Sequence, residues 1–339
     1  MQKNRIKYAL LSFFRTNQIL NSLIFLIYLL LARGSAFLLT PEADDAAVST
    51  TPLADFILNV LAGLNTWEYR IVEFGLLFVQ AVYISLIVRK HRLVSEYLLL
   101  PGAMYLLLAS AIPSFFSIFP ILVANTFVLI AIEQLMSTYR NPLASGKIFN
   151  LGFWIGLASL FYFPYVFLLL LAIFGLGSLR AFRISEFLAA LTGTFAVYFL
   201  TATIYFWYDH LIFFWQHQFA DNFAILNFAP LESNHDLVAF FILALLVLLV
   251  LFGYGSIVQK QNIQFQKKIG VLYIAAIISP LALFFQANVS LSHIAMLIIP
   301  IGILLGLLLA NVGRTSRELI HFLLLIGILA WQLNPYWLK

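Results

Sequence analysis

Long runs of apolar residues without a charged side chain are the feature that most constrains how this chain can fold. Residues 237–252 form one such run and residues 294–310 form another. About 20 consecutive apolar residues make a helix that crosses the hydrocarbon core of a bilayer. Hydrocarbon cannot hydrogen-bond to exposed backbone groups, so such segments must be helices or strands of a closed barrel, and continuous runs exclude the alternating pattern of barrel strands. The sequence therefore predicts an all-α, polytopic transmembrane helix bundle.

The composition agrees with this fold class. Hydrophobic residues make up 63% of the chain and charged residues 10%, and the mean hydropathy is +0.99, whereas soluble domains carry roughly 25% charged residues. No stretch between the apolar runs is long enough to bury a core, so we expect one integral membrane domain over residues 1–339. The absence of cysteine excludes disulfides and thiolate catalysis. The positive residues are dispersed in short loops, so no nucleic-acid partner is expected.

We expect about eleven spans, with the N-terminus in the cytoplasm and the C-terminus outside. The spans are expected near residues 19–39, 71–88, 97–112, 115–136, 149–163, 165–179, 187–208, 237–257, 269–287, 292–310 and 319–334. The fifth and sixth are short and meet at Pro164, which should end one helix and start a tight re-entry. Gly152 and Gly156 in the fifth span permit close packing against another helix.

The distribution of charge gives the orientation. All of the 19 lysines and arginines except Arg33, Arg70 and Lys339 fall in segments assigned to the cytoplasm, while most of the 14 acidic residues fall outside. Basic residues remain on the cytoplasmic side of bacterial membrane proteins. The pattern predicts a multi-pass membrane protein whose positively charged loops face the cytoplasm. Omitting one early span would invert every later loop.

Two external segments are longer than a simple turn. The first, about residues 40–70, begins with acidic residues and continues into an apolar stretch, residues 53–64, that fits a helix in the membrane interface. The second, about residues 209–236, mixes aromatic and polar side chains, which suit the headgroup region. Long loops are uncommon unless they have a function. A functional site is therefore expected in these two segments.

Asp44 and Asp45 are the candidate catalytic residues. Carboxylates in an external loop could act as general base in transfer from a lipid-linked donor, or could coordinate a divalent cation, the only cofactor that these residues suggest. No metal-binding motif is present. The alternative is an ordinary solvated loop, which is acidic because external loops carry few positive residues.

Arg33, Arg70 and Glu73 lie near the external ends of the first two spans. Charges at such depth are costly and are functional candidates with a nearby partner. Arg70 and Glu73 are three residues apart on one helix, so they can pair. Arg33 could bind a phosphate or pyrophosphate through two N–H groups. The alternative for Arg33 is that its long side chain reaches out to the headgroups.

Three histidines are further candidates for substrate contact. His210 and His217 lie in the second external segment, and His293 follows Ser292 at the start of the tenth span. Their spacing lacks the dense histidine pattern of di-iron or zinc enzymes, and an interfacial polar role is the alternative. Glu133, near the cytoplasmic end of the fourth span, is expected to cap that span near the headgroups or to pair with a basic residue such as Arg140, and a proton path is the alternative.

Three stretches of the sequence resemble a family of functionally unassigned polytopic membrane proteins from Bacteroidetes-type bacteria. They are Ser-Phe-Phe-Arg-Thr-Asn at residues 12–17; residues 149–164 with 179–186; and a late stretch containing Asn288, His293 and Pro300. The resemblance implies an inner-membrane location and no particular reaction.

At the level of layout, the chain is similar to polyprenyl-phosphate-dependent glycosyltransferases of the GT-C type. Those enzymes have many spans and a first external loop with an acidic catalytic residue. The similarity implies a catalytic role for Asp44 or Asp45 and contact of Arg33 or Arg70 with the phosphate of a polyprenyl-linked substrate in the membrane. This chain departs from the pattern in its short first loop and in lacking a soluble C-terminal domain. Two hypotheses therefore stand: a transferase acting on a lipid-linked sugar or related envelope precursor, and a non-enzymatic membrane component of an envelope assembly or transport system.

Overall fold

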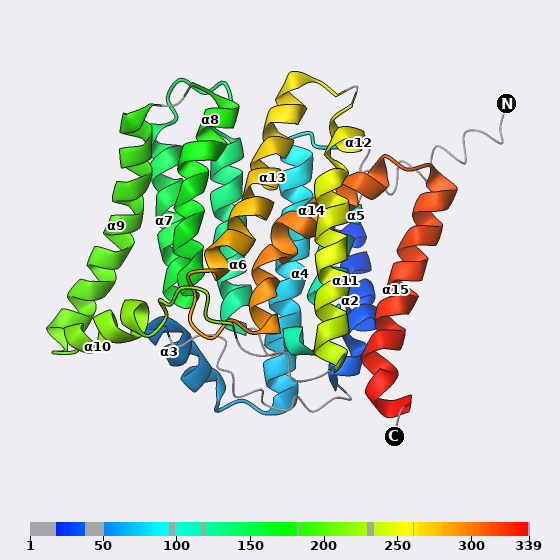
Figure 1. Ribbon diagram of the computed structural model, residues 1–339, viewed down its shortest axis with the longest axis horizontal. Coiled ribbons are helices and arrows are strands. Elements are labelled where there is room, and N and C mark those ends of the chain that lie inside the picture. Colours follow the sequence, from blue (N-terminus) through cyan, green and yellow to red (C-terminus); the bar gives the residue numbers. More distant parts are fainter. Residues whose placement is uncertain are drawn as a thin grey trace.

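The computed structural model describes residues 18–37, 51–94, 99–116, 119–181, 183–228, 234–259 and 261–337 (Figure 1). These residues form helices and turns, with two isolated β-bridges and no strand among them. The α-helices are α2 (Gln18–Arg33), α3 (Pro52–Leu61), α4 (Thr66–Lys90), α5 (Leu100–Ala109), α6 (Phe119–Met136), α7 (Ser145–Phe161), α8 (Leu176–Leu179), α9 (Ile184–Trp207), α10 (Leu211–Trp215), α11 (Asn234–Phe252), α12 (Tyr254–Val258), α13 (Ile263–Leu283), α14 (Ile298–Ala310) and α15 (Arg314–Trp337). The 3-10 helices are η1 (Gly34–Phe37), η2 (Pro113–Phe116), η3 (Phe163–Leu169) and η6 (Leu291–Leu297), and the π-helices are η4 (Leu171–Gly175) and η5 (Gln216–Ala220). The all-helical prediction is confirmed for this part of the chain.

The long helices stand side by side between two ends of the molecule (Figure 1). We call the end that carries α8 and the start of α13 the upper end, and the end that carries α3 and α10 the lower end. Helices α9 and α15 form the two outer edges in this view, while α3 and α10 lie across the lower end. Each of the eleven segments predicted as a span contains a helix in the structure.

Five helices in the described residues are long and apolar enough to cross a membrane. They are Thr66–Lys90, Phe119–Met136, Ile184–Trp207, Ile263–Leu283 and Leu291–Ala310. In Leu291–Ala310, 83% of the most apolar stretch is buried inside the bundle, the largest buried share of the five helices. In Ile184–Trp207 the buried share is 22%, the smallest. The segment Leu291–Ala310 therefore lies in the core, whereas α9 offers its apolar side chains to the surroundings.

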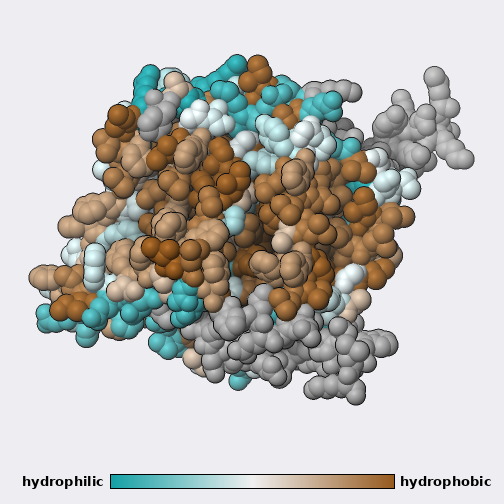
Figure 2. All heavy atoms as spheres, in the orientation of Figure 1, coloured by the Kyte–Doolittle hydropathy of each residue, from teal (hydrophilic) through white to brown (hydrophobic). Residues whose placement is uncertain are grey.

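Apolar side chains form a broad belt around the middle of the face shown in Figure 2, with hydrophilic residues gathered toward the two ends. On α9 alone, Phe195, Phe199 and Ile204 are each more than half exposed. A water-soluble monomer rarely exposes an apolar surface of this extent. The belt is the surface expected where lipid tails cover a helix bundle.

The predicted break at Pro164 is confirmed. Helix α7 ends at Phe161, and Tyr162 is extended, with φ −151° and ψ 105°. Pro164 then lies in the first turn of η3, where its missing N–H leaves no helical hydrogen bond unmade. The return segment continues through the π-helix η4 into α8. The segment predicted as the sixth span is therefore irregular over most of its length.

Helices α7 and α9 pack closely through small residues, as expected for Gly152 and Gly156. Both glycines face α9, Gly152 against Ala190 and Gly156 against Thr194. The Thr194 hydroxyl donates a hydrogen bond to the Gly152 carbonyl oxygen at 2.8 Å. A close approach of backbones with an interhelical hydrogen bond is typical of helix pairs in membranes.

Candidate functional site

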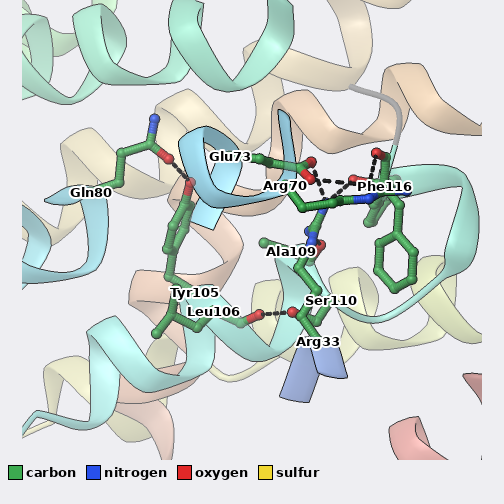
Figure 3. A network of polar contacts seen from close by, with 10 residues as sticks. Arg33, Arg70, Glu73, Gln80, Tyr105, Leu106, Ala109, Ser110 and Phe116 are labelled. Atoms are coloured by element: carbon green, nitrogen blue, oxygen red, sulfur yellow. Dashed lines mark hydrogen bonds and ion pairs between the residues drawn. The ribbon is translucent and has the colours of Figure 1, made fainter. Parts of the chain in front are cut away.

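Arg33, Arg70 and Glu73 meet inside the bundle (Figure 3), near the lower end, where α4 begins (Figure 1). We call them the Glu73 cluster. Arg33 is the last residue of α2, and the other two lie near the start of α4. Arg33 Nη2 lies 2.5 Å from Glu73 Oε1, and Arg70 Nη1 lies 3.1 Å from Glu73 Oε2. The predicted Arg70–Glu73 pair is confirmed, and Arg33 is added to it.

All three side chains are almost completely buried, with exposed fractions of 0%, 1% and 0%. Arg33 therefore does not extend to the surface. The alternative interpretation, in which its side chain reaches out to the headgroups, would require that it does. Backbone carbonyl oxygens complete the site. Arg33 donates to Ala109 at 2.6 Å and to Phe115 at 2.8 Å, and Arg70 donates to Phe116 at 2.7 Å. These carbonyls belong to the end of α5 and to η2, where helix geometry leaves acceptors unpaired and partly negative.

The Glu73 cluster carries more positive charge than its single carboxylate balances. The Phe116 ring adds a weak attraction, since the Arg33 guanidinium carbon lies 4.5 Å from the ring centroid. Arg33 Nε and Arg70 Nε and Nη2 have no hydrogen-bond partner among the described residues. Buried charges are costly unless they are paired and hydrogen-bonded. Two guanidiniums with spare donors can therefore bind an anion such as a phosphate.

Two groups of uncharged polar side chains are hydrogen-bonded inside the bundle. The Tyr105 hydroxyl donates to Gln80 Oε1 (Figure 3), and Gln80 Nε2 donates to Thr126 Oγ1 at 2.8 Å. The Tyr165 hydroxyl donates to Asn125 Oδ1. Sequence reasoning missed these residues. A signal was available, because Gln80 and Asn125 are amides within apolar stretches of α4 and α6, where a polar side chain usually has a partner.

His293 is buried, at 2% exposure, at the start of the Leu291–Ala310 segment. Its Nδ1 lies 3.0 Å from the backbone nitrogen of Ser290 and 2.9 Å from the Ser290 hydroxyl, in a capping box that begins η6. The ring also lies beside Tyr162, 5.6 Å between centroids. These contacts give His293 a helix-capping role at this position.

The two external segments of the sequence analysis meet at the lower end. The Thr51 hydroxyl, at the start of α3, donates to the Phe161 carbonyl oxygen at 3.1 Å. Leu53 of α3 packs in the same apolar group as Phe214 of α10. Asp55 of α3 lies near His217, and partial burial raises the pKa of this carboxyl while His217 lowers it. The first and second loops are therefore neighbours, as a shared site requires.

Neither His210 nor His217 contacts the arginines among the described interactions. His210 is exposed. His217 stacks on Phe213 at 4.0 Å between centroids, and its Nδ1 lies 3.8 Å from Asp221. In the part of the chain that the structure describes, no group of three or more histidine, aspartate or glutamate residues could hold a metal ion. Asp44 and Asp45, on which the catalytic and divalent-cation expectations rest, lie outside the described residues.

The fold and the Glu73 cluster define an all-helical protein with several helices able to cross a membrane and a buried, positively charged site near one end. Comparison of the chain with protein-family models, with curated proteins and with solved structures finds no match.

Proposed function

We propose that the chain is a multi-pass protein of a bacterial inner membrane, which crosses about eleven times with its N-terminus in the cytoplasm and its C-terminus outside. Helix is present at every predicted span. The end of α4, with Lys90, the end of α8, followed by Arg180, and the start of α13, with Lys268, lie at the upper end (Figure 1). The end of α2, with Arg33, and the start of α4, with Arg70, lie at the lower end. The upper end is then cytoplasmic. Reporter fusions at Lys90 and Asn222 test this topology: they should report opposite compartments, and a shared compartment would contradict it.

We propose further that the protein is a transferase acting at the outer face on a lipid-linked sugar or related envelope precursor. The observation that carries this proposal is the buried Glu73 cluster, in which two arginines share one carboxylate. The carrier lipid would lie along the bundle, and its phosphate would enter the cluster as the missing negative charge. Arg70 has the spare Nε and Nη2 donors to receive it.

The chemistry assigned to each group then follows. A hydroxyl oxygen of the acceptor attacks the anomeric carbon of the donor sugar, and the bond from that carbon to the phosphate oxygen breaks. The leaving carrier phosphate keeps the electron pair, and the arginines stabilise the negative charge that develops there. The acceptor proton passes to Asp44 or Asp45, as general base. Glu73 orients both guanidiniums and does not react.

Retention of a polyprenyl phosphate tests this proposal. The protein is purified in a mild detergent, offered undecaprenyl phosphate, and examined by native mass spectrometry. Arg70→Gln should lower retention about tenfold or more, because one charge-assisted contact is lost. Arg180→Gln is the matched control, since Arg180 also pairs with a glutamate, Glu186, at 2.9 Å, but near α8. Equal retention by wild type and Arg70→Gln, with both folded, would exclude the cluster as the phosphate site.

A non-enzymatic role in a transport or assembly system is the second candidate. Two observations favour it: the irregular return segment through η3 and η4, and the hydrogen-bonded polar pairs Gln80–Thr126 and Tyr165–Asn125 inside the bundle. Transporters place broken helices and polar side chains near the middle of the membrane. Under this hypothesis, replacing Tyr105 or Asn125 would impair the cellular function, while Asp44→Asn and Asp45→Asn would leave it intact.

A further inference from the structure

A second ionic cluster lies near the upper end, and Glu133 of α6 is at its centre. Lys90 Nζ lies 2.5 Å from Glu133 Oε1, and the Ser137 hydroxyl donates to the same oxygen at 2.9 Å. Gln134 Nε2 donates to Oε2 at 2.9 Å. The carboxylate of Glu133 is thus already satisfied. We use the name Glu133 cluster for Lys90, His91, Glu133, Lys147 and Lys268.

Lys268 of α13 is the unusual member of the Glu133 cluster. Its side chain is 5% exposed, and its Nζ donates to His91 Nδ1 at 3.1 Å. No carboxylate among the described residues lies within ion-pair distance of Lys268. An ammonium has three N–H donors, and an uncharged imidazole balances none of its charge. A buried lysine without an acidic partner is costly.

His91 connects Lys268 with Glu133. Because Nδ1 accepts from Lys268, the ring carries its proton on Nε2. That nitrogen has no hydrogen-bond partner in the described part of the chain and lies 3.9 Å from Glu133 Oε1. His91 is itself 4% exposed. The ring therefore fixes the position of the Lys268 ammonium without neutralising it.

Lys147 of α7 brings a third ammonium to the cluster. Its Nζ donates to the Ser137 carbonyl oxygen at 3.2 Å, and it lies close enough to His91 to repel the protonated ring. The Arg92 side chain, from the residue after His91, repels the Lys268 ammonium in the same way. The site therefore brings three lysines and one carboxylate together, and these four side chains come from four different helices. Charges of one sign that converge in this way attract a counter-ion.

We propose that the Glu133 cluster binds a phosphate-bearing anion between Lys268 and Lys147. The anion is either the headgroup phosphate of an anionic phospholipid or free phosphate, since both present the same oxygens to the ammonium groups. The site is separate from the Glu73 cluster, which lies near the other end of the bundle. Failure of one proposal therefore leaves the other standing.

The test measures ligand-dependent stabilisation of the full-length protein. The protein is placed in nanodiscs of phosphatidylcholine, or of phosphatidylcholine with phosphatidylglycerol, and its midpoint of heat denaturation is recorded with and without inorganic phosphate. Phosphatidylglycerol retained after detergent extraction is counted by native mass spectrometry. A shift with phosphatidylglycerol alone identifies the lipid headgroup, and a shift with inorganic phosphate in pure phosphatidylcholine identifies free phosphate.

Matched lysines supply the controls. Lys268→Met should abolish the stabilisation and lower retained phosphatidylglycerol about tenfold, and it removes a buried charge without leaving another unpaired. Lys267→Met, the neighbouring residue, should behave as wild type, because its Nζ points to the Leu179 carbonyl oxygen at 3.4 Å. Lys147→Met is a second probe at a half-buried position and should weaken binding severalfold. An equal response of all three variants and wild type, or no shift with either ligand, would overturn the proposal.

Discussion

Gly152 of α7 lies so close to Ala190 of α9 that a Cβ atom on the glycine would sit 1.7 Å from the Ala190 carbonyl oxygen. Gly193 of α9 makes the reciprocal approach, with its Cβ position 2.1 Å from the Phe149 carbonyl oxygen. Both obstacles are backbone atoms, which cannot move away as a side chain can. The separation of α7 and α9 is therefore set by glycine, and α9, exposed over most of its other faces, depends on this contact.

Gly152→Ala should separate the two helices and lower stability by about 1–3 kcal/mol, as is usual for an overpacked core. It should also strain the hydrogen bond from Thr194 to the Gly152 carbonyl. The measurement is the heat-denaturation midpoint of the purified protein in detergent. Gly177→Ala is the control, because nothing lies within 4 Å of its Cβ position. Equal midpoints for the two variants would show that α9 does not rely on the contact.

Glu73→Gln should be among the most damaging single changes in the chain. It leaves Arg33 and Arg70 buried together without a counter-charge, a loss of about 3–5 kcal/mol for a broken buried pair. Glu68→Gln is the control on the same helix: Glu68 is exposed and accepts from the Asn65 backbone nitrogen at 2.8 Å, a contact that glutamine can retain. Expression level and heat-denaturation midpoint are the measurements, and a Glu73→Gln protein as stable as Glu68→Gln would argue that the arginines are neutralised by other means.

His91 makes the stability depend on pH. Burial, and then the neighbouring Lys268, lower the pKa of His91 from 6.5 to about 4. Lys90 and Lys147 also lower it, while Glu133 opposes them. The unfolded chain therefore binds a proton at this site between pH 6.5 and 4 that the folded protein does not, so stability should fall as pH falls through this window, by at most about 3 kcal/mol.

Denaturation midpoints of wild type and His91→Gln between about pH 7 and pH 4.5 measure this effect. Glutamine can still accept the hydrogen bond from Lys268 but cannot take up the proton. Wild type should lose more stability on acidification than His91→Gln. Parallel curves for the two proteins would assign the pH dependence to other groups.

The positions of the helices were predictable because each helical segment has its own apolar run. The break at Pro164 was predictable for the same local reason, since a proline ring fixes its own φ and restricts the residue before it. The Arg70–Glu73 pair follows from their spacing of three residues on α4. These features depend on contacts within one helix or turn.

The partners of Arg33 and Glu133 could not be predicted, because they come from other helices. Glu73 lies 40 residues after Arg33, and the carbonyls of Ala109 and Phe115 are further still. Glu133 does pair with a basic residue, as expected, but that residue is Lys90 and not Arg140, the example suggested by nearness in sequence. Arg140 follows the end of α6 with a positive φ of 54° and stacks on Tyr139, 5.4 Å from its ring centroid. Its direction is set by the turn, so nearness in sequence did not bring it to the carboxylate.

The hydrogen bond from Tyr165 to Asn125 gives the last prediction. Both residues are completely buried, and the Asn125 Nδ2 atom has no partner among the described residues. Tyr165→Phe leaves Asn125 Oδ1 without a donor, so it should cost about 1–3 kcal/mol, the penalty for an unsatisfied buried group. The double variant Tyr165→Phe with Asn125→Leu removes both polar groups and should recover much of that loss, since an apolar pair of similar size has nothing left to satisfy. A double-mutant cycle of denaturation midpoints measures the coupling. Additive losses would show that the two side chains do not depend on each other.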